Sequence, residues 1–285
     1  MNSIEEAVKK LLAGSAADKK ETVRSPASFH GFEDQSQVTD SSGRTVCHID
    51  QARLRGLGFL TPDTTDGTLV EQYRVLKRPL IVNAFNKGFD KVENSNSVMV
   101  TSSLEGEGKT YTSFNLAISM AMERDYTVLL IDSDVIKASL SNLLGLSENL
   151  GLIDLLLNPD MELSDIIVST DIPRLKILPA GKPNVHSTEL LASEQMSRLS
   201  RELSNRYSDR IILYDAPPLL ATSQAKVLLS LAGQILLVVE AGGTPQDLVL
   251  ESASQLDNDK IVGVVLNKSR STSAGYYGGY YGSTR

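Results

Sequence analysis

A glycine-rich loop between an apolar run and a helical stretch limits how this chain can fold. Residues 98–115 read VMVTSSLEGEGKTYTSFN, and the loop within them ends in Gly106, Gly108, Lys109 and Thr110. Such a loop, placed between a strand and a helix, wraps backbone N–H groups around phosphates. Its lysine reaches the outer phosphates and its threonine hydroxyl binds Mg²⁺. The sequence therefore predicts ATP or GTP binding, although a serine stands where the full P-loop pattern has its first glycine.

Apolar runs and helical patterns alternate from about Thr68 onward. The expected strands are Val98–Thr101, Val128–Ile131, Leu175–Leu178, Ile211–Tyr214, Ile235–Val239 and Ile261–Leu266. The expected helices are Leu69–Phe89, bent or split by Pro79, then Thr110–Arg124, Leu140–Leu144, Gly151–Leu157, Glu189–Tyr207, Ser223–Leu231 and Pro245–Leu256. Continuous apolar runs are typical of parallel strands buried on both faces. The alternation predicts an α/β fold with a doubly wound, mostly parallel sheet.

Composition sets the limits of the domain organisation. Residues 1–66 are expected to form a mostly disordered linker with a short helix at 3–13, residues 67–268 a folded domain, and residues 269–285 a flexible tail. The formal net charge of −7 argues against a general nucleic-acid partner. The single cysteine, Cys47, excludes an internal disulfide framework. No signal peptide or membrane span is expected, so membrane association would require a partner.

Two further strands end in carboxylates. The run Val128–Ile131 leads into Asp132 and Asp134, which point the same way because side chains alternate along an extended chain. The run Ile211–Tyr214 leads into Asp215. At the carboxyl edge of a parallel sheet these groups would face the γ-phosphate and Mg²⁺, one holding the metal and another accepting a proton from an attacking hydroxyl. The alternative is that they only begin polar loops or cap helices.

The expected ATP-binding set extends around the loop. It comprises Glu105, Gly106, Glu107, Gly108, Lys109, Thr110, Tyr111 and, at the end of the last strand, Asn267. The amide of Asn267 can both donate to and accept from an adenine edge, and a simple turn role is equally compatible with its position. The side chains of Glu105 and Glu107 either tune Mg²⁺ or are solvated, and solvation is the favoured interpretation.

Tyrosines are concentrated near the end of the sequence. Tyr276, Tyr277, Tyr280 and Tyr281 are four of the nine tyrosines, and they stand among glycines and serines that cannot bury them. We interpret them as a phospho-acceptor cluster; a sticky low-complexity tail is the alternative.

Together these motifs resemble the bacterial tyrosine kinases of exopolysaccharide export, specifically the stand-alone cytoplasmic autokinases found with exosortase genes. The resemblance covers about residues 68–285. It implies a P-loop NTPase of the deviant-Walker, MinD/ParA-like kind, with ATP and Mg²⁺ as cofactors. Lys109, Asp132, Asp134 and Asp215 would be catalytic, and Thr110, Asp132 and Asp215 would hold the metal.

The resemblance also implies partners. Glu71, Arg74 and Lys77 resemble the helix through which such kinases assemble into homo-oligomeric rings, where the third position is usually Arg. A ring subunit's tail would enter its neighbour's active site, and phosphorylation would loosen the ring. A membrane polysaccharide co-polymerase would activate the kinase, a tyrosine phosphatase would reverse the reaction, and the protein would sit in the cytoplasm against the inner membrane.

Departures from the family pattern leave alternatives open. Ile136 and Ala138 stand where the family commonly has Arg and Pro, and Lys137 offers a point charge instead of a guanidinium fork. One alternative is therefore an ATP-gated scaffold without catalysis. Another is a division-site or partition ATPase of the same fold, but that group has a signature lysine where this chain has Leu104.

Overall fold

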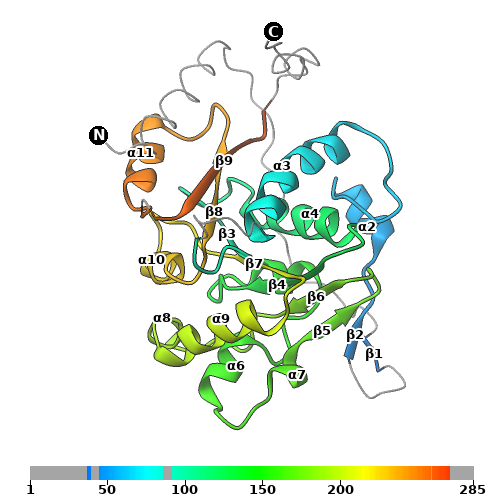
Figure 1. The fold of residues 1–285 in the computed structure, drawn as a ribbon, viewed down its shortest axis with the longest axis vertical. Coiled ribbons are helices and arrows are strands. Elements are labelled where there is room, and N and C mark those ends of the chain that lie inside the picture. The colour runs from blue at the N-terminus through cyan, green and yellow to red at the C-terminus, as the bar shows by residue number, and fades with distance from the viewer. Residues whose placement is uncertain (1–36, 40–44, 86–91, 258, 270–285) are drawn as a thin grey trace.

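The computed structural model describes residues 37–39, 45–85, 92–257 and 259–269 (Figure 1). The strands are β1 Gln37–Thr39, β2 Thr45–Cys47, β3 Ser97–Ser102, β4 Thr127–Asp132, β5 Val168–Thr170, β6 Leu175–Leu178, β7 Arg210–Asp215, β8 Gln234–Glu240 and β9 Ile261–Asn267. The helices are α2 Gln51–Gly56, α3 Thr68–Phe85, α4 Lys109–Ala121, α5 Ser139–Leu143, α6 Leu152–Leu157, α7 Leu163–Ile166, α8 Ser187–Leu191, α9 Glu194–Arg206, α10 Ser223–Leu229 and α11 Gln246–Ser254.

One sheet joins all the described strands in the order β1-β2-β5-β6-β4-β7-β3-β8-β9. The six strands from β6 to β9 are parallel, and they are the six that the apolar runs predict. Antiparallel pairing occurs only toward one edge among the described residues, between β1 and β2 and between β5 and β6. The predicted fold class, a mostly parallel α/β sheet, is confirmed.

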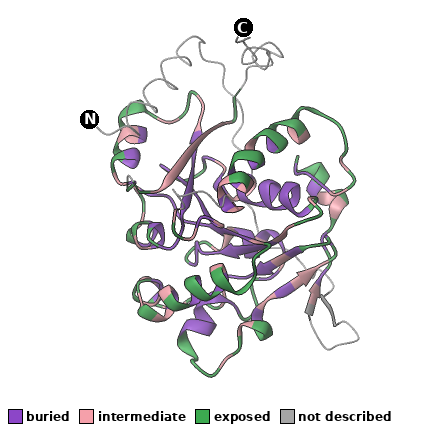
Figure 2. Ribbon diagram, in the orientation of Figure 1, coloured by how far each residue is buried: buried purple, intermediate pink, exposed green. Residues whose placement is uncertain are grey.

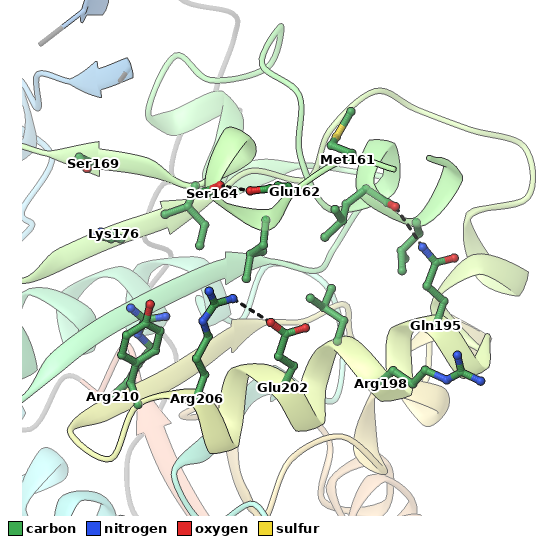
Figure 3. A pocket seen from close by; sticks show the side chains of 16 residues that line it. Met161, Glu162, Ser164, Ser169, Lys176, Gln195, Arg198, Glu202, Arg206 and Arg210 are labelled. Atoms are coloured by element: carbon green, nitrogen blue, oxygen red, sulfur yellow. Dashed lines mark hydrogen bonds and ion pairs between the residues drawn. The ribbon is translucent and has the colours of Figure 1, made fainter. Parts of the chain in front are cut away.

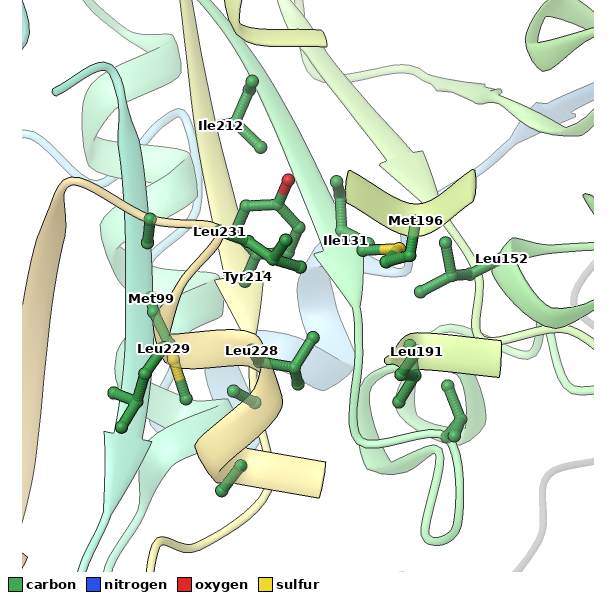
Figure 4. Packing of buried hydrophobic residues seen from close by; sticks show 14 of the residues in the cluster. Met99, Ile131, Leu152, Leu191, Met196, Ile212, Tyr214, Leu228, Leu229 and Leu231 are labelled. Atoms are coloured by element: carbon green, nitrogen blue, oxygen red, sulfur yellow. The ribbon is translucent and has the colours of Figure 1, made fainter. Parts of the chain in front are cut away.

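Helices cover both faces of this sheet (Figure 1). Alternate residues of a central strand enter different cores: Val98 and Val100 face α3 and α4, whereas Met99 faces the opposite core. That opposite core includes side chains of α6, α8, α9, α10 and α11, and Tyr214 lies fully buried within it (Figure 4). Burial on both faces explains why the strands carry continuous apolar sequence, and the central strands are buried throughout (Figure 2).

The folded domain begins before residue 67, so the expected linker extends too far. Cys47, Leu54 and Phe59 are buried in the same core as α3 and α4, and β2 pairs in parallel with β5. The N-cap of α2 is Asp50, whose side chain accepts a hydrogen bond from the Arg53 N–H at 3.0 Å. A three-residue strand and a six-residue helix are too short to leave a clear periodic pattern, which is why the sequence reads as linker.

Cys47 provides a direct test of whether the segment before residue 67 packs on the domain core. The thiol donates to the Leu144 carbonyl at 3.7 Å, and burial, followed by the nearby Asp171 carboxylate, raises its pKa to about 11. A buried, protonated thiol reacts only when its segment opens. We expect labelling by a disulfide reagent at pH 8 to be at least ~100-fold slower in the native protein than in urea. An added Val185→Cys thiol, at a 92 % exposed position, should react at once, whereas equally rapid reaction of Cys47 would contradict the docking.

Two predicted helices differ in detail. Helix α3 continues through Pro79, which therefore does not split it. The expected helix over residues 189–207 is two helices, because Ser193 ends the turn after α8 and caps α9 by accepting from the Met196 N–H at 3.2 Å. The short helix expected at residues 3–13 and the tail tyrosines lie outside the described residues. No helix in the described part of the chain is long and apolar enough to cross a membrane.

Candidate active site

The carboxyl ends of β3, β4 and β7 bring the predicted site residues together. Strand β3 runs into the P-loop, and Lys109 is the first residue of α4. Asp132 and Asp215 end β4 and β7, and they are register partners in the parallel ladder. The N–H groups of Ser133 and Asp134 both donate to the Asp215 carbonyl, at 2.9 and 3.1 Å. Sheet pairing therefore fixes the two carboxylates side by side beside the phosphate-binding loop.

The P-loop adopts backbone angles that favour glycine. Gly106 and Gly108 have φ values of 82° and 97°, in the left-handed region. A Cβ on Gly108 would lie 2.0 Å from the amide nitrogen of Asn267. That nitrogen instead donates to the Glu107 carbonyl at 2.8 Å, so the end of β9 supports the loop. The adenine contact expected of Asn267 stays a prediction, beside this structural role.

Lys109 is buried and forms an ion pair with Asp134, with 2.6 Å between its Nζ and Asp134 Oδ2. Burial lowers the pKa of Lys109, but the carboxylates of Asp215 and Asp134 outweigh that effect and raise it. The lysine is therefore a fixed positive charge among three aspartates. It is placed to exchange a carboxylate for a phosphate oxygen without leaving the site.

Asp132 and Asp215 each keep one buried oxygen without a hydrogen-bond partner. Asp132 Oδ2 accepts from the Ser141 N–H and hydroxyl, at 2.8 and 2.7 Å, while its Oδ1 has no partner. Asp215 Oδ1 accepts from the Ser113 hydroxyl at 2.9 Å, while its Oδ2 has none. The sequence did not single out Ser113 or Ser141, although Ser113 lies one helical turn after the P-loop lysine.

The pKa values reflect this crowding of negative charge. Burial, followed by the Asp215 carboxylate, raises the pKa of Asp132 to about 7. Burial likewise raises the pKa of Asp215, and it outweighs Lys109 and the hydroxyls of Thr110 and Ser113, which lower it. A bound cation would offset the cost of burying two adjacent carboxylates.

These groups fit Mg²⁺. Mg²⁺ is usually held by one or two carboxylates together with substrate phosphates and water, not by a closed protein cage. Across the described ranges, no group of three or more His, Cys, Asp or Glu side chains forms such a cage. The two free carboxylate oxygens, together with the Thr110 hydroxyl next to Asp215, would supply the ligands that the smaller arrangement needs.

The two loop glutamates differ from each other. Glu105 is exposed and pairs with Lys137. Glu107 is buried, which corrects the expectation that it is solvated: its carboxylate accepts from the Leu104 N–H at 2.6 Å and from the Thr244 hydroxyl. Glu107 thus connects the P-loop to the loop after β8, and its buried side chain stabilises the contact between these two loops. Contact of either glutamate with ATP stays a prediction.

The side chain of Tyr111 contacts the segment that precedes the predicted domain. Its hydroxyl donates to the Gly58 carbonyl at 2.7 Å, and its ring centroid lies 4.8 Å from that of Phe59. In this structure the Tyr111 side chain therefore packs at the start of α4 and anchors the 45–66 segment. Its expected contact with ATP is not among these interactions and stays a prediction.

The three positions of α3 expected to mediate ring assembly are not equally exposed. Glu71 and Arg74 are exposed on α3 and pair with each other. Lys77 is only 7 % exposed, and its Nζ donates to the Ser119 carbonyl at 2.7 Å and pairs with Glu123 at 2.6 Å. Lys77 therefore joins α3 to α4 within the chain, which differs from the expected interface role. The expected phospho-acceptors, Tyr276, Tyr277, Tyr280 and Tyr281, lie outside the described residues.

Comparison with known proteins agrees with the fold described above. The AAA domain family matches residues 96–257. The tyrosine-protein kinase YwqD of Bacillus subtilis is 30% identical over 216 residues, which are 75% of this chain and 86% of the relative. The kinase domain of the Escherichia coli tyrosine kinase ETK superposes with a TM-score of 0.64 at 30% identity, over 76% of this chain and 83% of that domain.

The cell-division ATPase MinD of Pyrococcus furiosus shares the fold alone, with a TM-score of 0.50 at 24% identity over 62% of this chain and 73% of that protein. The likeness to the tyrosine kinases is stronger and covers most of both chains. The family match over residues 96–257 includes the P-loop and the strands that end in Asp132 and Asp215. The chain therefore belongs to the bacterial tyrosine-protein kinases, as a P-loop, nucleotide-binding member.

Proposed function

We propose that this kinase transfers the γ-phosphate of ATP to its own tyrosines Tyr276, Tyr277, Tyr280 and Tyr281, and thereby regulates the length and export of an exopolysaccharide. The observation that carries the proposal is the site itself, in which Lys109 and two unpartnered carboxylate oxygens meet at the end of the P-loop. A relative is the succinoglycan biosynthesis transport protein ExoP of Rhizobium meliloti, 33% identical over 83% of this chain and 29% of that protein.

The chemistry follows from the placement of each group. The tyrosine oxygen forms a bond to the γ-phosphorus while the bond from that phosphorus to the leaving ADP oxygen breaks. Mg²⁺, held by Thr110, Asp132 and Asp215, would neutralise phosphate charge. Lys109 turns from Asp134 to the transferring phosphate, and this frees the Asp134 carboxylate to accept the tyrosine proton.

The proposed partners extend beyond the chain. A second copy would contact the exposed pair of Glu71 and Arg74 on α3, giving a homo-oligomeric ring. A membrane polysaccharide co-polymerase would activate the kinase and hold it at the cytoplasmic side of the membrane. A tyrosine phosphatase would remove the phosphates from the tail tyrosines. Ile136, 65 % exposed beside the site, is a position where such a contact would cover an apolar side chain.

Intact mass after incubation with Mg·ATP tests the proposal. We expect gains of about 80 Da per phosphate in the wild-type chain. The gains should be absent from Lys109→Ala and from a chain lacking its last ten residues. Lys226→Ala, which removes an exposed lysine on α10, should behave as wild type.

Other outcomes would identify the alternatives. ATP hydrolysis without any phosphotyrosine would replace the proposal with a MinD/ParA-type ATPase. ATP binding and assembly without either reaction, even with the membrane partner's cytoplasmic segment present, would replace it with a scaffold. Ile136, at the position where the family commonly has Arg, is the residue that favours this scaffold.

A further inference from the structure

A groove of about 590 Å³ lies away from the P-loop, between α7 and α9 and over β5 and β6 (Figure 3). Its apolar lining includes Leu155, Leu163, Ile167 and Leu199. A second cavity of about 290 Å³ adjoins it at the amino-terminal ends of β4 and β7. The two share Ser169, Lys176, Tyr207 and Arg210, so they form one continuous surface, here called the basic groove.

Positive charge is concentrated in the basic groove. The side chains that line its larger part include Lys176, Arg198, Arg206 and Arg210 but only two acids, Glu162 and Glu202. Arg206 pairs with Glu202, and Arg198 pairs with Glu194 on its own helix, each at 2.8 Å. Within the described ranges Lys176 and Arg210 form no ion pair with a carboxylate. In a chain of net charge −7, this local excess selects an acidic occupant.

The sheet face leads from the basic groove to β1. Val46, Ser169 and Lys176 are register partners on β2, β5 and β6, and all three are partly exposed. On the neighbouring row, Gln37 pairs with Cys47 and Cys47 with Thr170. The start of β1 thus lies two strand spacings, about 10 Å, from Thr170, which lines the second cavity.

The residues directly before β1 have matching chemistry. Residues 28–36 read SFHGFEDQS and contain two of the six phenylalanines of the chain, Phe29 and Phe32, followed by Glu33 and Asp34 with no lysine or arginine. Phe32 is five residues before Gln37, and five extended residues reach about 17 Å. Asp34 would arrive first at the basic end of the groove, and the phenylalanines would continue onto its apolar lining.

We propose that residues 29–34 of the same chain occupy the basic groove, with Glu33 and Asp34 against Lys176 and Arg210 and with Phe29 and Phe32 on the apolar side chains. The second cavity lies at the amino-terminal ends of β4 and β7, and no residue that lines either part of the groove belongs to the nucleotide site. Docking would therefore add a contact between the amino-terminal segment and α9 without involving the nucleotide site. It would remove an acidic, aromatic sequence from solvent and close the uncovered part of the sheet face.

Disulfide trapping in the full-length chain tests this directly. In the variant Phe32→Cys with Ser169→Cys, mild oxidation at low protein concentration should give an intramolecular disulfide, identified by peptide mapping that separates it from native Cys47. We expect a yield at least ~5-fold above that of Phe32→Cys with Ser254→Cys, whose second cysteine is exposed on α11. A yield equal to this control would overturn the proposal and leave the groove to a separate partner. A disulfide between two chains would also overturn it, in favour of a second copy.

Charge reversal provides the matching test of recognition. Adding Glu33→Lys and Asp34→Lys should reduce trapping by about 5-fold or more, because like charges would meet in the groove. Adding Lys176→Glu and Arg210→Glu to that variant should restore it. If the disulfide yield is unchanged by both charge reversals, charge does not guide docking and the proposed contacts are overturned. None of these residues belongs to the phosphoryl-transfer site, so autophosphorylation of the same variants reports separately on the proposed function.

Discussion

Asp215→Asn is expected to slow autophosphorylation by roughly 10²-fold or more while making the protein more stable. Asp215 is fully buried next to Asp132, its partner across β4 and β7. An asparagine at this position keeps the acceptor for the Ser113 hydroxyl and places an N–H₂ group where Oδ2 has no partner. The substitution removes the repulsion between two adjacent buried carboxylates, which we expect to add about 1 kcal/mol of stability.

The same change removes a proposed Mg²⁺ ligand. We expect the rate of phosphoryl transfer to fall by roughly 10²–10³-fold or more, since electrostatic groups of this kind contribute that much to catalysis. Intact-mass time courses and thermal unfolding without nucleotide measure the two effects. Asp209→Asn, at an exposed position before β7, is the control and should alter neither. Wild-type rates in the Asp215 variant would remove the residue from the proposed mechanism.

Phe59→Ala is expected to cost about 3–4 kcal/mol of unfolding free energy, although the residue lies in sequence that reads as a linker. Phe59 is only 4 % exposed, and its ring centroid lies 4.8 Å from that of Tyr111 and 5.7 Å from that of Phe114. Removal of the ring leaves a cavity against α4, the helix that begins at Lys109. Because the start of this helix presents the P-loop lysine, ATP affinity should weaken as well.

Urea unfolding at 25 °C, with titration of ATP into the native variant, measures both consequences. Leu57→Ala is the matched control, because Leu57 lies two residues before Phe59, is 46 % exposed, and its loss should cost no more than about 0.5 kcal/mol. Equal stability of the two variants would mean that residues 45–66 do not contribute to the domain core, and it would restore the boundary expected near residue 67.

The central sheet and the aspartates were predictable because each carries a strong local pattern. Strands such as β4 and β7 are buried on both faces, so their runs of apolar residues end abruptly in carboxylates. The AAA domain family, the shared fold and the kinase relatives confirm the fold class and the tyrosine-kinase family. Roles assigned to individual residues rest on the geometry and stay predictions until they are tested by substitution.

What the sequence missed depends on contacts between distant segments. Strand β2 has three residues and becomes visible only through its pairing with β5. Lys77 looks like a surface position, but its long side chain reaches the Ser119 carbonyl and Glu123 across the helix interface. Glu107 resembles a solvated loop residue, and nothing local indicates that Thr244, more than a hundred residues later, binds its carboxylate.

The contact between Asn267 and the P-loop also determines how the tail is tethered. Asn267 donates to the Glu107 carbonyl, and Lys268 pairs with Glu240 at 2.8 Å, so the chain leaves the fold at the rim of the nucleotide site. Tyr276 is the ninth residue after Asn267, and nine residues span about 30 Å at most. A short tether of this kind would keep the proposed acceptor tyrosines at a local concentration on the order of millimolar. The tethered tyrosines would then be present at a far higher local concentration than a tyrosine that arrives by diffusion, which favours the tail as the first substrate.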